Sequence, residues 1–191
     1  MKVIKVKYKL SVNSPVILSF VAICFVVNIL NYITNGTSNA LMFMTYRSSY
    51  TSFITYVRMF THVLGHLDWN HFVGNMMYVL LLGPMLEEKY GSLRIIQVIT
   101  IAAFVTGLIN NLLFWNVALC GASGVCFAFI LLSSFTSFKD GEVPLTFIIV
   151  AIIYLGQQVY DGIVLNDNVS NLAHIIGGVV GAIIGYKLNK K

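Results

Sequence analysis

The sequence predicts an all-α membrane protein, a bundle of six transmembrane helices with both termini in the cytoplasm. Hydrophobic residues make up 58% of the 191 residues and charged residues only 10%, against about 25% charged residues in ordinary soluble domains. Six apolar stretches alternate with polar or charged segments, and most of the basic residues fall on one side of the predicted membrane. We therefore expect one polytopic membrane domain over residues 1–191, and the small size favours a bacterial plasma membrane.

The first helix is expected at 15–33, where a long apolar stretch follows a basic N-terminal segment. The stretch lacks a small-residue cleavage site, so it is interpreted as a membrane span and not as a cleavable signal peptide. Residues 1–14 then form a short basic cytoplasmic N-terminus. Residues 34–70 are rich in aromatic side chains and poor in charge, which predicts a long external loop lying in the membrane interface.

Five further spans follow from apolar stretches between charged or polar anchors. The segment from Ile95 to Phe138 contains no charged residue, and as one helix it would be roughly twice as long as the membrane core is thick. It must therefore turn once, and asparagines at positions 110, 111 and 116 mark the expected turn. The five helices are expected at 71–87, 94–114, 123–138, 145–160 and 171–187.

The distribution of basic residues predicts the orientation. With the N-terminus in the cytoplasm, ten of the twelve lysines and arginines fall in cytoplasmic segments, and only Arg47 and Arg58 lie outside. Cytoplasmic segments of membrane proteins carry such an excess of positive charge. The net charge of +5 is therefore assigned to topology, and no nucleic-acid partner is expected.

Four polar residues inside or beside the apolar helices predict a functional site. Polar side chains are costly in a membrane and usually face a protein interior. Ser123 opens one predicted helix, His174 lies near the start of another, and His71 and Asn75 share one face of a third. These helices run in the same direction, and the distances to their charged inner ends place Ser123, His71 and His174 at similar heights. Taken singly, each residue could serve packing alone.

Small residues spaced four apart predict close packing between the helix that opens with Ser123 and the helix that contains His174. The small residues are Gly124 and Ala128 in the first helix and Gly177, Gly181 and Gly185 in the second. Such spacing lets two helix backbones approach each other. Close packing would bring Ser123 against His174 as the nucleophile and base of a serine hydrolase, and Gly121 would let the backbone bend beside the serine.

Four motifs together resemble those of the rhomboid family of intramembrane serine proteases. They are "GASG", "AHIIGGVVG", "HLDWNHFVGN" and "GPMLEEKYGS". The resemblance covers about residues 55–187, which would form the catalytic core. It implies that Ser123 is the nucleophile and His174 its base in a dyad without an aspartate. It also implies that His71, Asn75 and the backbone N–H of Ser123 stabilise the oxyanion.

The same resemblance implies roles for several supporting residues. Glu87 and Gly91 match a family "E-x-x-x-G" motif of structural type. Arg58 matches the arginine of a Trp-Arg loop motif, although Val57 stands where tryptophan is usual, which puts the anchoring of the first loop in doubt. Phe127 stands where tyrosine is frequent, so a hydroxyl is lost while a ring remains for the histidine to stack on.

The implied substrates are transmembrane helices of other membrane proteins within the lipid bilayer. A helical peptide bond must be unwound before it can be hydrolysed, so helix-destabilising residues are expected near the cleaved bond. The dyad mechanism requires neither a cofactor nor a metal ion.

Two other interpretations use the same polar residues. A zinc enzyme would use His62, His66 and His71 as ligands, but the sequence has no H-E-x-x-H motif, and Asp68 is the only carboxylate in this segment. A transporter or channel would line a path with the polar side chains. No inverted repeat and no ionisable chain crossing the membrane is found in the sequence.

Overall fold

The computed structural model describes residues 11–136, 142–164 and 171–189, which are almost entirely helical. Within these ranges no strand is formed, and an isolated β-bridge joins Thr45 to Leu119. In chain order the elements are α1 (Pro15–Ile33), the π-helix η1 (Asn39–Phe43), α2 (Phe53–Thr61), α3 (Trp69–Tyr90), α4 (Ser92–Leu113), α5 (Ser123–Ser134), α6 (Leu145–Val164) and α7 (Asn171–Asn189).

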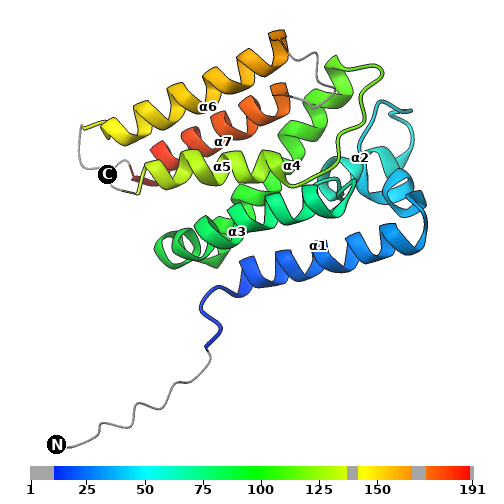
Figure 1. The fold of residues 1–191 in the computed structure, drawn as a ribbon, viewed down its shortest axis with the longest axis horizontal. Coiled ribbons are helices and arrows are strands. Elements are labelled where there is room, and N and C mark those ends of the chain that lie inside the picture. Colours follow the sequence, from blue (N-terminus) through cyan, green and yellow to red (C-terminus); the bar gives the residue numbers. More distant parts are fainter. Residues whose placement is uncertain (1–10, 137–141, 165–170, 190–191) are drawn as a thin grey trace, which may run out of the picture.

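The long helices form one bundle, with α1 and α6 at opposite edges (Figure 1). Between these edges α1 packs on α3, α3 on α5, α5 on α7, and α7 on α6. Helix α4 contacts both α5 and α7, and it also supports the short α2. Helix α5 lies in the centre of the bundle, and every residue from Gly124 to Leu132 is buried. These residues are all apolar, which suits a helix that is surrounded by other helices.

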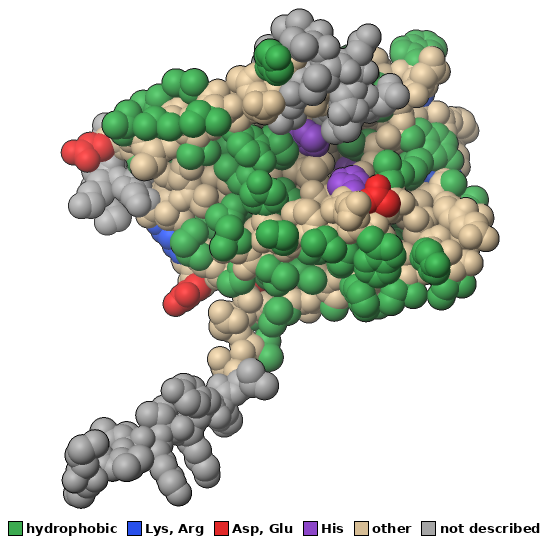
Figure 2. All heavy atoms as spheres, in the orientation of Figure 1, with side chains coloured by type: hydrophobic (Ala, Val, Ile, Leu, Met, Phe, Trp, Pro, Cys, Tyr) green, Lys and Arg blue, Asp and Glu red, His purple; other side chains and the backbone are tan. Residues whose placement is uncertain are grey.

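Helix lengths and compositions are those of a membrane protein. Among the described residues, α1, α4 and α7 are each long and apolar enough to cross a bilayer. Helix α5 and the first part of α6, Leu145–Tyr154, are apolar but shorter. Apolar side chains also cover much of the face of the bundle that Figure 2 shows, as expected where lipid is the solvent.

The predicted end of the central helix was wrong. Helix α5 ends at Ser134 and not at 138, and residues 137–138 lie outside the described part of the chain. Hydroxyl groups at this end donate to nearby carbonyl oxygens, from Ser133 to Ile130 at 2.8 Å and from Thr136 to Ser133 at 2.7 Å, in competition with regular helical bonds. The height of Ser123 therefore cannot be counted along one continuous helix from Lys139.

The segment 34–70 was expected to be a loop, but it contains η1 and α2. Helix α2 has only nine residues, too few to be recognised as a span. It lies close to α4, where a Cβ atom added at Gly107 would be 2.7 Å from the Met59 carbonyl oxygen. The helix predicted at 145–160 is also different at its end, since α6 continues four residues further to Val164. The other four predicted helices agree with the structure to within three residues at each end, and α1 coincides with its predicted range.

Helices α5 and α7 meet backbone to backbone, as the spacing of small residues predicts. A Cβ atom at Gly177 would overlap the carbonyl group of Gly124, and a Cβ atom at Gly181 would overlap that of Ala128. Only glycine fits at either position of α7 without separating the two helices. This contact sets the distance between the N-terminal ends of α5 and α7.

Replacing Gly181 by valine should force α5 and α7 apart, because the added atoms meet backbone and not a flexible side chain. We expect a destabilisation of at least about 1–3 kcal/mol, the usual cost of overpacking a core, or loss of the folded state. Thermal unfolding in detergent micelles, followed by circular dichroism, measures the effect. Gly156→Val is the matched control, since nothing lies within 4 Å of a Cβ atom there. Equal melting temperatures for the two variants would contradict the close contact.

Candidate active site

Ser123 and His174 lie together where α5 and α7 begin. The hydroxyl Oγ of Ser123 is 2.8 Å from Nε2 of His174, within hydrogen-bond distance. His174 is 9% exposed, and Figure 2 shows histidine side chains reaching the surface among apolar ones. A neutral imidazole in this position can accept the serine proton, which is the contact that an activated hydroxyl nucleophile needs.

Aromatic rings fix the plane of the His174 imidazole. Phe127 stacks on it with ring centroids 4.5 Å apart and an angle of 9° between the planes. Tyr154 of α6 packs edge-on against Phe127 at 4.2 Å. Phe127 therefore supplies the stacking surface without the hydroxyl that a tyrosine would carry.

The segment before Ser123 is held by hydrogen bonds from its backbone N–H groups to His62 and His66. Gly121 has φ of +129°, a conformation that favours glycine. Its N–H donates to the carbonyl oxygen of His62 at 2.9 Å. The N–H of Ala122 donates to Nε2 of His66 at 3.5 Å. These two bonds fix the direction in which the chain enters α5.

His66 is fully buried and links Asn31 and Asn39 to the segment before Ser123. Its carbonyl oxygen accepts hydrogen bonds from Nδ2 of Asn39 at 2.8 Å and of Asn31 at 3.4 Å. Burial, and secondly the nearby His71, lower the pKa of His66 to about 4, so its ring is neutral near pH 7 and can accept from Ala122. The sequence interpretation considered His66 only as a metal ligand, because its partner is distant in the chain.

His71 and Asn75 approach the same segment from α3. A Cβ atom at Gly121 would be 2.6 Å from Cε1 and 2.7 Å from Nε2 of His71, and 3.4 Å from Nδ2 of Asn75. Only glycine fits between these side chains. Asn75 is 7% exposed, and its Nδ2 has no hydrogen-bond partner within the described part of the chain. A buried donor is thus left unpaired beside the residues that lead into Ser123.

The histidines of the zinc interpretation face different partners. Nδ1 of His62 is 3.3 Å from the Arg58 carbonyl oxygen, and its Nε2 is 3.4 Å from Oγ1 of Thr106. The rings of His66 and His71 meet edge to face, with centroids 5.2 Å apart. In the ranges that the structure describes, no three side chains of His, Cys, Asp or Glu are grouped as a metal site.

At the opposite end of α3, the Glu87 carboxylate joins three helices. It accepts hydrogen bonds from the N–H groups of Val16 at 3.1 Å and Ile17 at 3.0 Å, and from the Ser92 hydroxyl at 2.6 Å. Gly91, with φ of +83°, makes the turn from α3 to α4. Glu87 and Gly91 therefore hold the starts of α1 and α4 against the end of α3.

Arg58 anchors the first loop although tryptophan is absent beside it. Its Nε donates to the Leu41 carbonyl oxygen at 2.9 Å. Its guanidinium carbon lies 4.5 Å from the ring centroid of Tyr46, a cation–π distance. An aromatic ring from a different part of the loop thus contacts the arginine, while Val57 contributes none.

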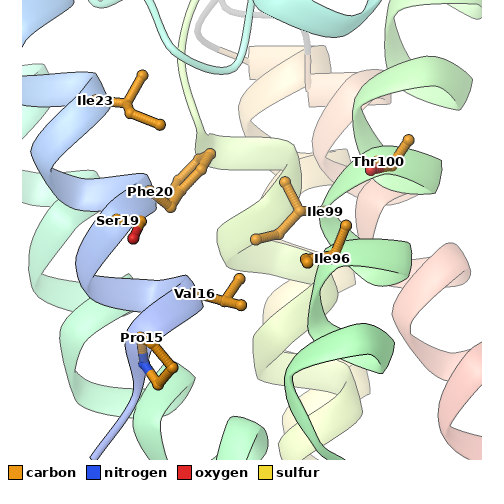
Figure 3. A pocket seen from close by; sticks show the side chains of 8 residues that line it. All are labelled: Pro15, Val16, Ser19, Phe20, Ile23, Ile96, Ile99 and Thr100. Carbon is orange, nitrogen blue, oxygen red and sulfur yellow. The ribbon is translucent and has the colours of Figure 1, made fainter. Parts of the chain in front are cut away.

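A groove of about 410 Å³ lies between α1 and α4, away from these residues (Figure 3). Its lining is apolar apart from the hydroxyls of Ser19 and Thr100. No titratable side chain lines it, so the groove offers no acid–base chemistry. The candidate active site is the group around Ser123 and His174.

Acid should destabilise the fold through His66, which lies outside the spanning helices. Its pKa falls from 6.5 to about 4 on folding, so between these values the unfolded chain binds a proton that the folded chain does not. The free energy of unfolding therefore has its full value above about pH 6.5. It decreases by up to roughly 3 kcal/mol as the pH falls toward 4.

Melting temperatures in detergent across this pH range measure the effect. His66→Gln should flatten the pH dependence. Burial lowers the pKa of His62 in the same sense, so this second histidine leaves a residual slope. A wild-type melting temperature that does not change with pH in this window would contradict the burial of neutral histidines.

Comparison with known proteins gives consistent matches along the chain. The family model described as Rhomboid domain matches residues 54–191. A protein named Rhomboid protease GlpG from Serratia proteamaculans is 24% identical over 176 residues, covering 90% of this chain and 62% of the relative. The protein of the same name from Haemophilus influenzae is 23% identical over 181 residues, covering 93% and 92%.

A plant relative is also found. Rhomboid-like protein 11, chloroplastic, from Arabidopsis thaliana is 26% identical over 160 residues, covering 74% of this chain and 55% of the relative. The chain therefore spans less than two thirds of the Serratia and Arabidopsis relatives and nearly all of the Haemophilus one.

Proposed function

This chain belongs to the rhomboid family, and on that premise we propose that it is an intramembrane serine protease. It would hydrolyse peptide bonds in or near transmembrane helices of other membrane proteins. The observation that carries the proposal is the 2.8 Å contact between Ser123 Oγ and His174 Nε2. The family and the apolar helices also make the chain an integral membrane protein.

In the proposed reaction, Ser123 Oγ attacks the carbonyl carbon of the scissile bond. His174 Nε2 takes the hydroxyl proton during the attack and gives it to the leaving amine when the C–N bond breaks. Water then hydrolyses the acyl-enzyme, with His174 again acting first as base and then as acid. The Phe127 stack supports this role, because it holds the imidazole plane while the ring gains and loses a proton.

We assign the oxyanion to three donors, namely the His71 ring, the Asn75 amide and the Ser123 backbone N–H. The support is the position of His71 and Asn75 around Gly121 and the unpaired Nδ2 of Asn75. A pre-placed donor strengthens its interaction as charge develops on the carbonyl oxygen, which lowers the activation free energy. An unpaired buried donor costs stability in the free enzyme, as expected if its partner arrives with the substrate.

The proposed topology has six membrane spans in a single domain over 1–191, with both termini in the cytoplasm and a catalytic core at about 55–187. The excess of basic residues in cytoplasmic segments supports this orientation. Two of the relatives described above come from bacteria, which supports a bacterial plasma membrane. Substrate helices with glycine, proline or small polar residues near the cut are favoured, because they unwind more readily.

Ser123→Ala and His174→Ala should each abolish hydrolysis of a transmembrane substrate while the protein stays folded. The first substitution removes the nucleophile and the second removes the base. The assay uses purified protein in liposomes, and melting temperatures show that each variant is folded. Substantial residual proteolysis by either variant would disprove the dyad, and a chelator such as EDTA should leave the wild-type rate unchanged.

Asn75→Ala should lower kcat by roughly 10²–10³, the effect of losing one oxyanion donor, with little change in KM. His71→Ala should act in the same sense. The double variant should lose less than the product of the single effects, because both donors serve one oxygen. Kinetics on a fluorogenic membrane-helix substrate measure these values. A raised KM with unchanged kcat would assign Asn75 to substrate binding and reject the oxyanion role.

A reporter fused after Lys191 tests the topology. An enzyme reporter that works only in the cytoplasm should be active, whereas one that needs the external side should be inactive. Activity of the external reporter would reject the proposed topology of six spans with both termini in the cytoplasm.

A further inference from the structure

A thiol of α5 contacts the proposed oxyanion residue Asn75. Cys126 lies three residues after Ser123 and is 2% exposed. Its Sγ is 3.4 Å from the backbone oxygen of Asn75 and 3.8 Å from the side-chain oxygen Oδ1. These are sulfur hydrogen-bond distances, and a thiol can donate its one hydrogen to either oxygen.

The contact with the thiol concerns which end of the Asn75 side-chain amide, Nδ2 or Oδ1, faces Gly121. An asparagine side chain presents a donor, Nδ2, at one end and an acceptor, Oδ1, at the other. Nδ2 lies toward Gly121, at 3.4 Å from a Cβ atom placed there, while Oδ1 lies toward the thiol. With the amide reversed, Oδ1 would face the position of the oxyanion, where an acceptor repels negative charge.

We propose that Cys126 is a positioning residue that holds the Asn75 amide with its Nδ2 turned toward the reacting carbonyl oxygen. The inference rests on the proposed oxyanion role of Asn75. In this proposal the thiol directs its one hydrogen to Oδ1, and reversing the amide would then place two donors, the S–H and the NH₂ group, against each other. Because Cys126 and Ser123 share α5, the helix that carries the nucleophile also orients the oxyanion donor.

Packing alone would leave a different signature. A valine at position 126 is larger than cysteine by about one methyl group, so it keeps the space filled, but it cannot donate a hydrogen bond. Serine retains a donor with a smaller side chain. The pair of substitutions therefore separates loss of the donor from loss of volume.

The test is a double-mutant cycle of Cys126→Val and Asn75→Ala, with kcat and KM measured in liposomes on a fluorogenic membrane-helix substrate. Cys126→Val should lower kcat about 3- to 10-fold, the range expected for one ordinary hydrogen bond, with KM nearly unchanged. Cys126→Ser should retain most of the activity. In the Asn75→Ala background, Cys126→Val should have no further effect, because the amide that it orients is gone.

Each contrary result has a separate meaning. If Asn75→Ala leaves kcat unchanged, the oxyanion role fails and this inference fails with it. If Asn75→Ala lowers kcat but the two effects multiply, or if serine loses as much as valine, Cys126 acts through packing and only this inference is overturned. An unchanged kcat in Cys126→Val also overturns it.

Two controls keep the result interpretable. Cys24→Val removes another buried thiol, whose Sγ lies against the Val63 carbonyl oxygen, and should leave kcat unchanged. Melting temperatures are recorded for all variants, and Cys126→Ala replaces Cys126→Val in the cycle if the valine variant does not fold. Cys126→Ala must then also have no further effect on kcat in the Asn75→Ala background.

Discussion

The backbone contact between α5 and α7 determines the rest of the site. Lipid chains are as apolar as the helix surfaces, so helices in a bilayer associate through close packing rather than through the hydrophobic effect. Gly177 and Gly181 allow the carbonyl groups of Gly124 and Ala128 to touch α7 directly. Ser123 and His174 stand at the beginnings of these two helices, so their separation of 2.8 Å follows from a contact made further along them.

The segment that leads into Ser123 is held in place by hydrogen bonds, because its backbone is irregular. The segment before Ser123 has no helix of its own to satisfy its N–H groups, and an unpaired group is costly in a membrane protein. The carbonyl of His62 and the ring of His66 supply two of the missing acceptors. A loop that the sequence presents as a connection therefore forms part of the wall around the nucleophile.

Much of this arrangement could be predicted from local sequence patterns. The features that were missed depend on individual hydrogen bonds, several of them between residues that are far apart in the sequence. The bounds of α1 and the approach of α5 to α7 follow from apolar length and glycine spacing. The start of α5 at Ser123 was predicted, but its end at Ser134 was not, because it depends on hydroxyl groups that bond to nearby carbonyl oxygens, such as Ser133 to Ile130. The structure also shows what holds the segment before α5, since Nδ2 of Asn110 donates to Val117 O at 3.0 Å and a bridge joins Thr45 to Leu119. The structural role of His66 was missed because its donor is 56 residues away.

The Glu87 carboxylate has a consequence for how the chain is made. Ser14 makes no side-chain cap for α1, and the N–H groups of Val16 and Ile17 are instead capped by a residue about 70 positions later. During synthesis α1 emerges first, so it must wait in the membrane with its first turn incompletely bonded until α3 has followed. The start of α1 is therefore capped only after Glu87 has been made, and a ribosome-bound chain truncated before Glu87 should hold α1 in the bilayer without this cap.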